Sequence, residues 1–290
     1  MQYDMPLYRP PSEADSLILQ ITLGCSHNKC TFCSMYKTKK YRVLSDQEIE
    51  QHLAWAKDYY PFASRIFLAD GNALALNTEK LSRLVSGLYK EFPNLERVTA
   101  YAGPKDILEK KLSELQAIKD SGLQMLYMGI ESGSPVILKE INKGVTPAEM
   151  IEAGQKARQA GFKLSCTIIL GLGGRDNWRE HAVETASVIN AIQPEYVGAL
   201  TLMVEDITPL ARKVKNGEFD LLNPQEVLQE LEVFISHTQL ENCIFRSNHA
   251  SNYLALKGTL NKDKEKLLEL LQEAKRIGKD AFRPEGWRGL

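Results

Sequence analysis

The chain has 290 residues, of which 43% are hydrophobic and 25% charged, and its formal net charge is −1. A chain of this length buries about three quarters of the surface that it exposes when unfolded, so it needs neither disulfides nor a metal in order to fold. The near-zero charge gives no reason to expect nucleic acid or an anionic membrane as a partner. The N-terminus does not resemble a secretory signal, and apolar runs such as 197–204 are too short to span a bilayer. We therefore expect a cytoplasmic protein without membrane contact.

Short β-rich runs alternate with amphipathic segments along the chain. The runs that predict strands are 17–23, 65–69, 97–101, 124–130, 163–170 and 196–203. The segments that predict helices are about 45–60, 78–91, 104–122, 147–161 and 176–191. Ser45 and Glu48 have the spacing of a capping box at the start of the first helix. Pro147 stands at the first position of a later helix, and Gly161 follows the end of that helix.

This alternation predicts an α/β fold. Six successive βα units imply a parallel sheet with right-handed crossovers. Six strands are too few for a closed eight-stranded barrel, so we expect a partial (β/α)6 TIM-like barrel. Residues 204–290 differ in pattern, with a helix at 224–237, an extended segment at 243–246 and a charged helix at 262–276. We expect residues 1–203 to form the core with its N-terminal lead-in, and 204–290 to form an α/β extension that closes one side without being an independent domain.

Three of the five cysteines, Cys25, Cys30 and Cys33, lie within nine residues. In a reducing cytoplasm such a group indicates metal binding or catalysis rather than disulfides. Three thiolates would hold three irons of a [4Fe–4S] cluster and leave one iron open to a small molecule. Zinc with His27 as a fourth ligand is an alternative, although His27 lies between two of the cysteines and its ligation would strain the loop. A redox pair of Cys30 and Cys33 is another alternative, and it would leave Cys25 without a role.

The cysteine loop resembles the signature of the radical S-adenosylmethionine (SAM) superfamily, Cys-x3-Cys-x2-Cys with an aromatic residue before the third cysteine. Phe32 supplies that aromatic residue, and the loop follows the first predicted strand as it does in that family. The chain departs from the pattern by one extra residue between Cys25 and Cys30. The resemblance covers about residues 15–203. It implies a [4Fe–4S] cluster held by Cys25, Cys30 and Cys33, with SAM bound at the open iron.

Three further motifs carry the resemblance, and each follows a predicted strand at the end that carries barrel active sites. Asp70-Gly71-Asn72 stands where the family holds the methionine amino group, and Glu131 with Ser132 stands where the family contacts the ribose and carboxylate. The third motif, 168–173, stands where the family has a motif near the adenine. The residues to which the resemblance assigns SAM contacts are Phe32, Asp70, Gly71, Asn72, Glu131, Ser132, Gly171 and Leu172.

The same resemblance implies the reaction. A reduced cluster would give one electron to the SAM sulfonium, methionine would leave, and a 5′-deoxyadenosyl radical would abstract hydrogen from an unidentified small-molecule substrate. Cleavage of a different carbon–sulfur bond is an alternative, and a flavodoxin- or ferredoxin-type protein would supply the electron. Two other functions remain open: a tRNA- or cofactor-modifying radical SAM enzyme, and a non-catalytic zinc or iron–sulfur binding protein. The net charge and the lack of an appended RNA-binding module argue against tRNA.

Candidate substrate contacts are Glu205, after the sixth predicted strand, and Arg246 and His249 in the C-terminal part. For any single one of them, an ordinary polar loop is the favoured interpretation. The segment 27–42 has five basic residues and no acidic one. It is compatible with docking of an acidic electron donor, with a phosphate-bearing substrate, or with a solvated loop, including at its most basic part, 37–42.

Overall fold

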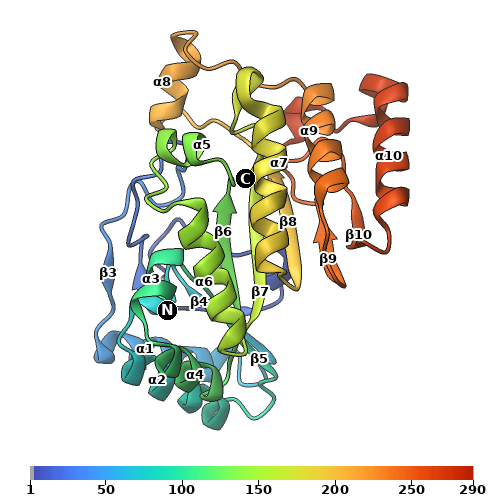
Figure 1. Ribbon diagram of the computed structural model, residues 1–290. Helices are drawn as coiled ribbons and strands as arrows, with labels where there is room; N and C mark the ends of the chain where they lie inside the picture. Colours follow the sequence, from blue (N-terminus) through green and yellow to red (C-terminus); the bar gives the residue numbers. More distant parts are fainter. Residues whose placement is uncertain (1–2, 290) are drawn as a thin grey trace. The chain divides into compact units, whose positions relative to one another are not determined.

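The fold is that of a computed structural model, which describes residues 3–289. One sheet contains eight strands in the order β1-β4-β5-β6-β7-β8-β9-β10 (Figure 1). The described pairings from β1 to β9 are parallel, and β10 runs antiparallel to β9. The chain divides into two compact units, the first made of residues 3–28, 33–128 and 156–164 and the second of 29–32, 129–155 and 165–289. This mostly parallel α/β arrangement confirms the predicted fold class.

The first unit contains the strands that open the sheet and the helices that follow them. Its strands are β1 (Leu17–Gln20), β4 (Arg65–Ala69), β5 (Arg97–Tyr101) and most of β6 (Leu123–Glu131), and a separate hairpin pairs β2 (Thr22–Leu23) with β3 (Arg42–Val43). Its helices are α1 (Asp46–Tyr59), α2 (Thr78–Glu91), α3 (Pro104–Glu109) and α4 (Leu112–Asp120). Strand β4 pairs Ile66 with Leu17 on one side and with Val98 on the other. Ile66 to Ala69 have no exposed surface, as expected of a parallel strand covered on both faces.

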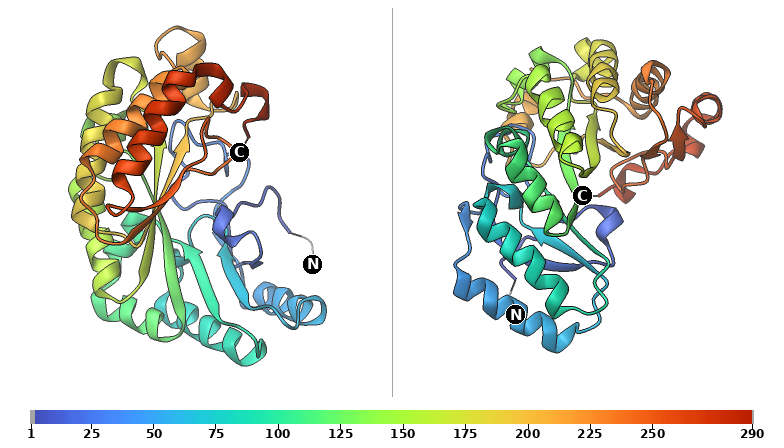
Figure 2. Two further views of the ribbon diagram at one scale, coloured as in Figure 1. Left: turned by 90° about the vertical axis from the view of Figure 1, so that its right-hand side faces the viewer. Right: turned by 60° about the horizontal axis from the view of Figure 1, so that its bottom comes forward.

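The second unit continues the sheet. Its strands are the end of β6, β7 (Lys163–Leu170), β8 (Tyr196–Thr201), β9 (Cys243–Arg246) and β10 (Lys257–Leu260). Its helices are α5 (Pro135–Glu140), α7 (Gly174–Ile192), α8 (Pro209–Lys215), α9 (Pro224–His237) and α10 (Lys264–Ile277), and α6 (Pro147–Gln159) connects to β7. Helix α9 packs against both α7 and α10, so the three lie side by side (Figures 1 and 2). Short 3-10 turns complete the described chain at Pro11–Glu13, Ala73–Ala75, Gly278–Ala281 and Glu285–Trp287.

The turn after β6 lies directly on the backbone of α7 at Gly133. A Cβ atom at Gly133 would be 2.2 Å from the carbonyl oxygen of Glu184, which no side chain could tolerate. The Gly133 N–H donates to Thr185 Oγ1 at 2.8 Å, so the same glycine is also held by a hydrogen bond. Only glycine permits this approach.

Several predicted elements need correction. The run 17–23 is two strands, because the chain leaves the main sheet after Gln20 and pairs with β3 instead. The helix predicted at 104–122 is two helices, because a second helix is capped at Lys111, whose N–H donates to Glu114 Oε2 at 2.7 Å. The strand predicted to reach 203 ends at Thr201, and α5, α8 and β10 were not predicted. Among residues 3–289, no helix has the length and apolar character needed to cross a membrane.

Candidate functional site

The three clustered cysteines lie in the loop between β2 and β3. They are partly exposed, and none of the five cysteines forms a disulfide. Cys25 and Cys33 belong to the first unit and Cys30 to the second. Within residues 3–289, no three His, Cys, Asp or Glu side chains are arranged to hold a metal ion. Ligation by these cysteines therefore stays a prediction.

The middle of the cysteine loop, residues 29–32, is fixed by backbone hydrogen bonds within the second unit. The Thr31 N–H donates to the carbonyl of Ile141 at 2.9 Å, and the Thr31 carbonyl accepts from the N–H of Leu210 at 3.0 Å. Ile141 ends α5 and Leu210 lies in α8, the two short helices that the sequence analysis missed. The signals that could have found them are the Pro residues at their first positions, after Ser134 and Thr208.

Asp70, in the first unit, is fully buried and joined to the residue before Cys25. One of its carboxylate oxygens accepts from Gln20 Nε2 at 3.0 Å. The other accepts from the Gly24 N–H and from Lys39 Nζ, both at 2.9 Å. Lys39 is itself buried, and its ammonium group lies 3.3 Å from Asp4. The carboxylate is thus occupied by donors of the protein, and it holds Gly24 in place.

The two residues after Asp70 also touch the cysteine loop. A Cβ atom at Gly71 would be 3.1 Å from Cys25 Cβ and 3.0 Å from the ring of Tyr36, so the chain needs a small residue here. The Gly71 N–H donates to the Gly24 carbonyl at 3.0 Å. Asn72, also buried, donates to Ser26 Oγ at 2.8 Å. The 70–72 motif is therefore packed against residues 24–26.

Tyr36 provides a test of whether these residues fit an iron–sulfur cluster. Its hydroxyl is buried and has no hydrogen-bond partner among the described residues. Burial raises its pKa most, and Tyr101, Asp70, Cys25 and Cys33 raise it further, so the group stays a neutral donor. An unsatisfied buried hydroxyl costs about 1–3 kcal/mol. A donor without an acceptor, close to two cysteines, fits a group such as a cluster whose sulfurs accept hydrogen bonds.

Glu131 and Ser132 lie at the end of β6 in the second unit. Glu131 has a left-handed backbone with φ of 63°, a conformation that non-glycine residues rarely adopt outside functional or tightly constrained positions. Its carboxylate pairs with Lys143 Nζ at 3.0 Å, and a Cβ atom at Gly129 would lie 2.1 Å from the same carboxylate. A side chain at position 129 would therefore displace it. Ser132 is buried, and its Oγ accepts from the Ser134 N–H at 3.0 Å.

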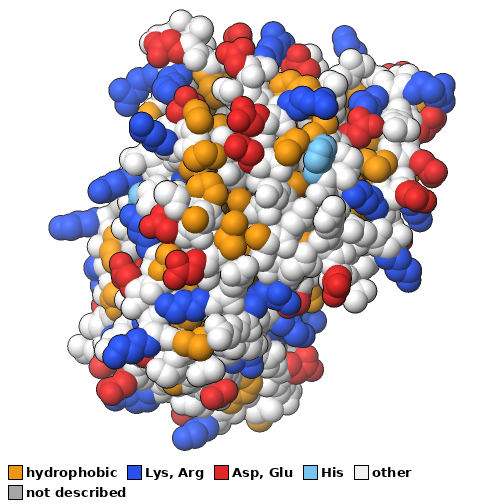
Figure 3. All heavy atoms as spheres, in the orientation of Figure 1, with side chains coloured by type: hydrophobic (Ala, Val, Ile, Leu, Met, Phe, Trp, Pro, Cys, Tyr) orange, Lys and Arg blue, Asp and Glu red, His pale blue; other side chains and the backbone are white. Residues whose placement is uncertain are grey.

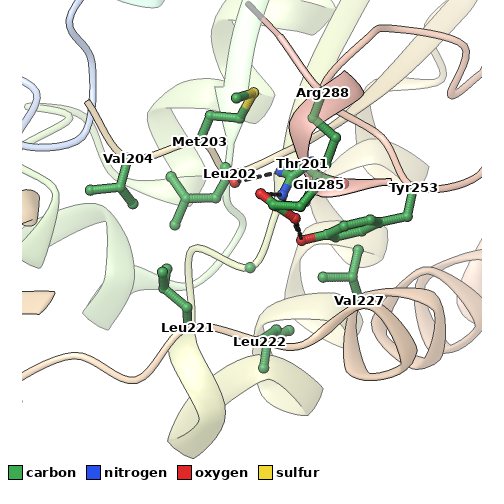
Figure 4. A pocket seen from close by; sticks show the side chains of 11 residues that line it. Thr201, Leu202, Met203, Val204, Leu221, Leu222, Val227, Tyr253, Glu285 and Arg288 are labelled. Carbon is green, nitrogen blue, oxygen red and sulfur yellow. Dashed lines mark hydrogen bonds and ion pairs between the residues drawn. The ribbon is translucent and has the colours of Figure 1, made fainter. Parts of the chain in front are cut away.

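A cavity of about 350 Å³ opens in the second unit where β7 and β8 end (Figure 4). Its lining residues are Gly171, Thr201, Leu202, Met203, Val204, Leu221, Leu222, Val227, Tyr253, Glu285 and Arg288. Three polar members pair with one another: Glu285 accepts from Tyr253 Oη at 2.7 Å and from Arg288 Nη1 at 2.6 Å. Arg288 also donates to the carbonyl of Leu202 at 3.1 Å and stacks on the Tyr253 ring. The remaining wall is mainly aliphatic, so the cavity could hold a group that has an apolar and a polar side.

The three predicted substrate contacts do not line this cavity as far as the described residues show. Arg246 is exposed on β9 and donates to the carbonyl of Phe245 at 2.7 Å. His249 hydrogen-bonds Ser251 Oγ at 2.9 Å, and burial, followed by the nearby Arg283, lowers its pKa. Glu205 is exposed beyond β8. Their role in substrate binding stays a prediction, and the sequence analysis did not assign Tyr253, Glu285 or Arg288 to the site.

Several basic side chains of the segment 27–42 interact within the protein, so fewer of them could contact a partner than the sequence indicates. Lys39 is buried against Asp70, and Arg42 pairs with Glu48 at 2.8 Å. Lys37 Nζ donates to the Asn28 carbonyl at 2.9 Å. Part of this positive charge therefore stabilises the loop itself.

The parallel sheet and the three-cysteine loop after its first strand define an α/β core with a cysteine loop and further polar motifs at strand ends. The chain belongs to the Radical SAM superfamily, whose family model matches residues 19–186. It is therefore a radical SAM enzyme, and this family uses a [4Fe–4S] cluster and SAM. Such an enzyme needs a reductant and a substrate.

Individual relatives are distant. Heme chaperone HemW of Bacillus subtilis is 26% identical over 215 residues, which are 72% of this chain and 54% of that protein. The 4′-phospho-dehydrooxetanocin synthase of Priestia megaterium is 24% identical over 206 residues, 64% of this chain and 28% of that protein. The chain thus spans about half the length of HemW and less of the synthase.

Two solved structures share the fold. Coproporphyrinogen III oxidase (HemN) from Escherichia coli superposes with a TM-score of 0.57 at 21% identity, covering 76% of this chain and 52% of that one. Methylornithine synthase (PylB) superposes with a TM-score of 0.54 at 17% identity, covering 78% and 63%. These likenesses support the partial-barrel architecture that the sequence predicts.

Proposed function

We propose that this protein reductively cleaves SAM and uses the resulting radical to abstract hydrogen from a small molecule. The observation that carries the proposal is the packing of the 70–72 motif on the cysteine loop. A Cβ atom at Gly71 would lie only 3.1 Å from Cys25 Cβ. In a radical SAM enzyme, that juxtaposition brings a cofactor-binding motif to a cluster ligand. Residues 1–203 would form the catalytic core and 204–290 an extension packed on it.

The proposal assigns three roles: binding the cluster, holding the cysteine loop, and binding SAM. Cys25, Cys30 and Cys33 would hold the cluster, which when reduced would supply one electron for cleavage of a carbon–sulfur bond of SAM. Asp70 holds Gly24, which precedes Cys25, through its buried hydrogen bonds. The residues proposed to bind and orient SAM are Phe32, Asp70, Gly71, Asn72, Glu131, Ser132, Gly171 and Leu172.

The partners follow from the same proposal. We propose a flavodoxin- or ferredoxin-type electron donor and the reducing cytoplasm as the location, since three cysteines within nine residues are typical of metal binding in a reducing compartment. The cavity of about 350 Å³ would take an apolar part of the substrate. Glu205, Arg246 and His249 do not line that cavity, so they would contact only a part of the substrate that lies outside it.

A cofactor-modifying or cofactor-handling role is the second candidate, because the relative HemW is a heme chaperone and the cavity has both a leucine- and valine-lined wall and an ion pair. Modification of tRNA is less favoured, since acidic and basic side chains are interspersed over the face seen in Figure 3. Titration of the purified protein with hemin separates the second candidate from the first.

The test of the proposal is anaerobic reconstitution followed by a cleavage assay. We expect about four iron and four sulfide per chain. Dithionite should then drive release of 5′-deoxyadenosine and methionine from SAM. A protein that binds only zinc and leaves SAM intact under these conditions would contradict the proposal.

Replacing Tyr36 with phenylalanine tests whether its hydroxyl serves the cluster. Loss of a hydrogen bond to cluster sulfur should make the reduction potential more negative, by roughly 40 mV for a bond worth about 1 kcal/mol. The cluster-free variant should be at least as stable as the wild type, because the unsatisfied hydroxyl is gone. Electron paramagnetic resonance at controlled potential measures the first effect and urea unfolding the second. Tyr59→Phe, at an exposed tyrosine, is the control; equal potentials in Tyr36→Phe and wild type would contradict the role.

A further inference from the structure

The peptide unit between Leu170 and Gly171, at the end of β7, is held from both sides. Its carbonyl oxygen accepts from the Leu202 N–H at 2.9 Å. Its N–H donates to Glu230 Oε2 at 2.7 Å. The turn that follows contains two left-handed glycines, Gly171 with φ of 88° and Gly174 with φ of 58°. Because glycine permits many conformations, the two hydrogen bonds determine which one the turn adopts.

Glu230 is an unusual residue for its place on α9. It has no exposed surface, and the same helix face carries Val227, Leu231 and Phe234. Its second oxygen bonds Nδ1 of His181 on α7, which is also buried. A buried carboxylate is disfavoured relative to an apolar residue that would pack on this face. Its two partners therefore point to a role that packing does not require.

His181 completes the arrangement. Its Nε2 is buried and has no partner among the described residues. The ring is thus committed to Glu230 through its other nitrogen and holds the carboxylate in a single orientation. Gly173 lies against the same histidine, since a Cβ atom there would be 3.1 Å from His181 Cβ. Glu230 and His181 therefore support both ends of the 171–173 segment.

We propose that Glu230 is a positioning residue for SAM, acting through the Gly171 N–H, with His181 fixing the carboxylate. The inference rests on the proposed function, because it takes the 171–174 turn to be a SAM contact. Gly171 also lines the cavity, so the orientation of this turn shapes the wall next to a bound ligand. Glu230 touches neither cofactor nor substrate in this proposal.

The experiment compares Glu230→Met, Glu230→Gln and the control Glu232→Gln, which changes a carboxylate on the same helix that pairs with Lys275. Hydrogen exchange of peptides covering 168–176 is measured by mass spectrometry in the cluster-free protein, where it does not depend on the cofactor. The dissociation constant for SAM is measured by equilibrium dialysis of the reconstituted protein. The KM for SAM and kcat for 5′-deoxyadenosine release are measured separately.

In Glu230→Met, we expect faster exchange at 168–176 and a SAM affinity about 10-fold weaker, because SAM binding must then reorder a turn that has lost a charge-assisted hydrogen bond worth about 1.5 kcal/mol. The rate at saturating SAM should stay within about 2-fold of wild type, since the effect is on binding. Glu230→Gln keeps an acceptor oxygen for the Gly171 N–H and should recover part of the affinity. Glu232→Gln should change neither exchange nor affinity.

Two results would overturn the inference. Unchanged exchange at 168–176 in both Glu230 variants would show that the carboxylate does not hold the turn. Faster exchange with unchanged SAM affinity would show that the turn does not position SAM, even if SAM cleavage continues. Failure of the wild type itself to bind SAM would instead refute the proposed function, and the exchange data would still report on the turn. If Glu230→Met does not fold, the Glu230→Gln variant decides between these outcomes.

Discussion

Replacing Cys33 with serine should reduce SAM cleavage by more than about 100-fold, since even a residue that only supports a metal ligand typically accounts for 10–100-fold. Serine is a poor ligand for cluster iron, because these clusters are held by thiolates. Iron and sulfide content, the paramagnetic resonance of the reduced cluster and 5′-deoxyadenosine release measure the effect. Cys25→Ser and Cys30→Ser should behave in the same way.

The control for this result is Cys243→Ala. Cys243 is buried in β9, and burial raises its pKa to about 12, so it remains a neutral thiol. Its replacement should leave the iron content unchanged. Full iron loading and normal SAM cleavage in Cys33→Ser would show that this cysteine is not a ligand.

The Asp70→Ala variant should be destabilised by about 3–5 kcal/mol, because it leaves a buried ammonium group without its main partner. Lys39 has only 4% of its side chain exposed and lies 2.9 Å from Asp70, so it cannot reach water instead. The Asp70→Ala change also removes the acceptor for the N–H of Gly24, the residue before Cys25. Urea-induced unfolding of the cluster-free protein measures the effect.

The double variant Asp70→Asn with Lys39→Met tests whether the loss of stability comes from the unpaired buried charge or from the change in side-chain shape. Removing both charges should recover most of the lost stability, because a buried ion pair often contributes little net free energy. Glu91→Gln breaks a half-exposed pair with Lys57 and should change stability by less than about 1 kcal/mol. A loss in Asp70→Ala no larger than in Glu91→Gln would contradict the buried-pair account.

The sequence best predicted those elements whose structure depends only on the residues of one segment. Strands β4, β5, β7 and β9 and helices α2 and α9 begin and end where predicted, since apolar runs and helix caps are local signals. Helices α5 and α8 have six and seven residues, too few for a periodic pattern. Strand β10 reads Lys-Gly-Thr-Leu, which has little β character of its own and becomes a strand by pairing with β9.

The candidate site was predictable only in part for the same reason. The cysteines and the strand-end motifs are recognisable because their residues are close together in sequence. The side-chain partners of the Asp70 carboxylate are Gln20 and Lys39, 50 and 31 residues away, and no local pattern links them. Glu230 lies 59 residues from Gly171 on a helix that otherwise looks amphipathic. Such pairs form only when the chain folds.

The contact between Gly133 and α7 has a consequence for redesigning this enzyme. Because the Glu184 carbonyl occupies the space where a side chain would begin, position 133 cannot be randomised in a library without separating β6 from α7. The cavity wall formed by Leu221 and Leu222 has no comparable constraint, and Leu221 is 41% exposed. Selection for a new substrate should therefore fix glycine at 133 from the start and enrich changes at 221 and 222.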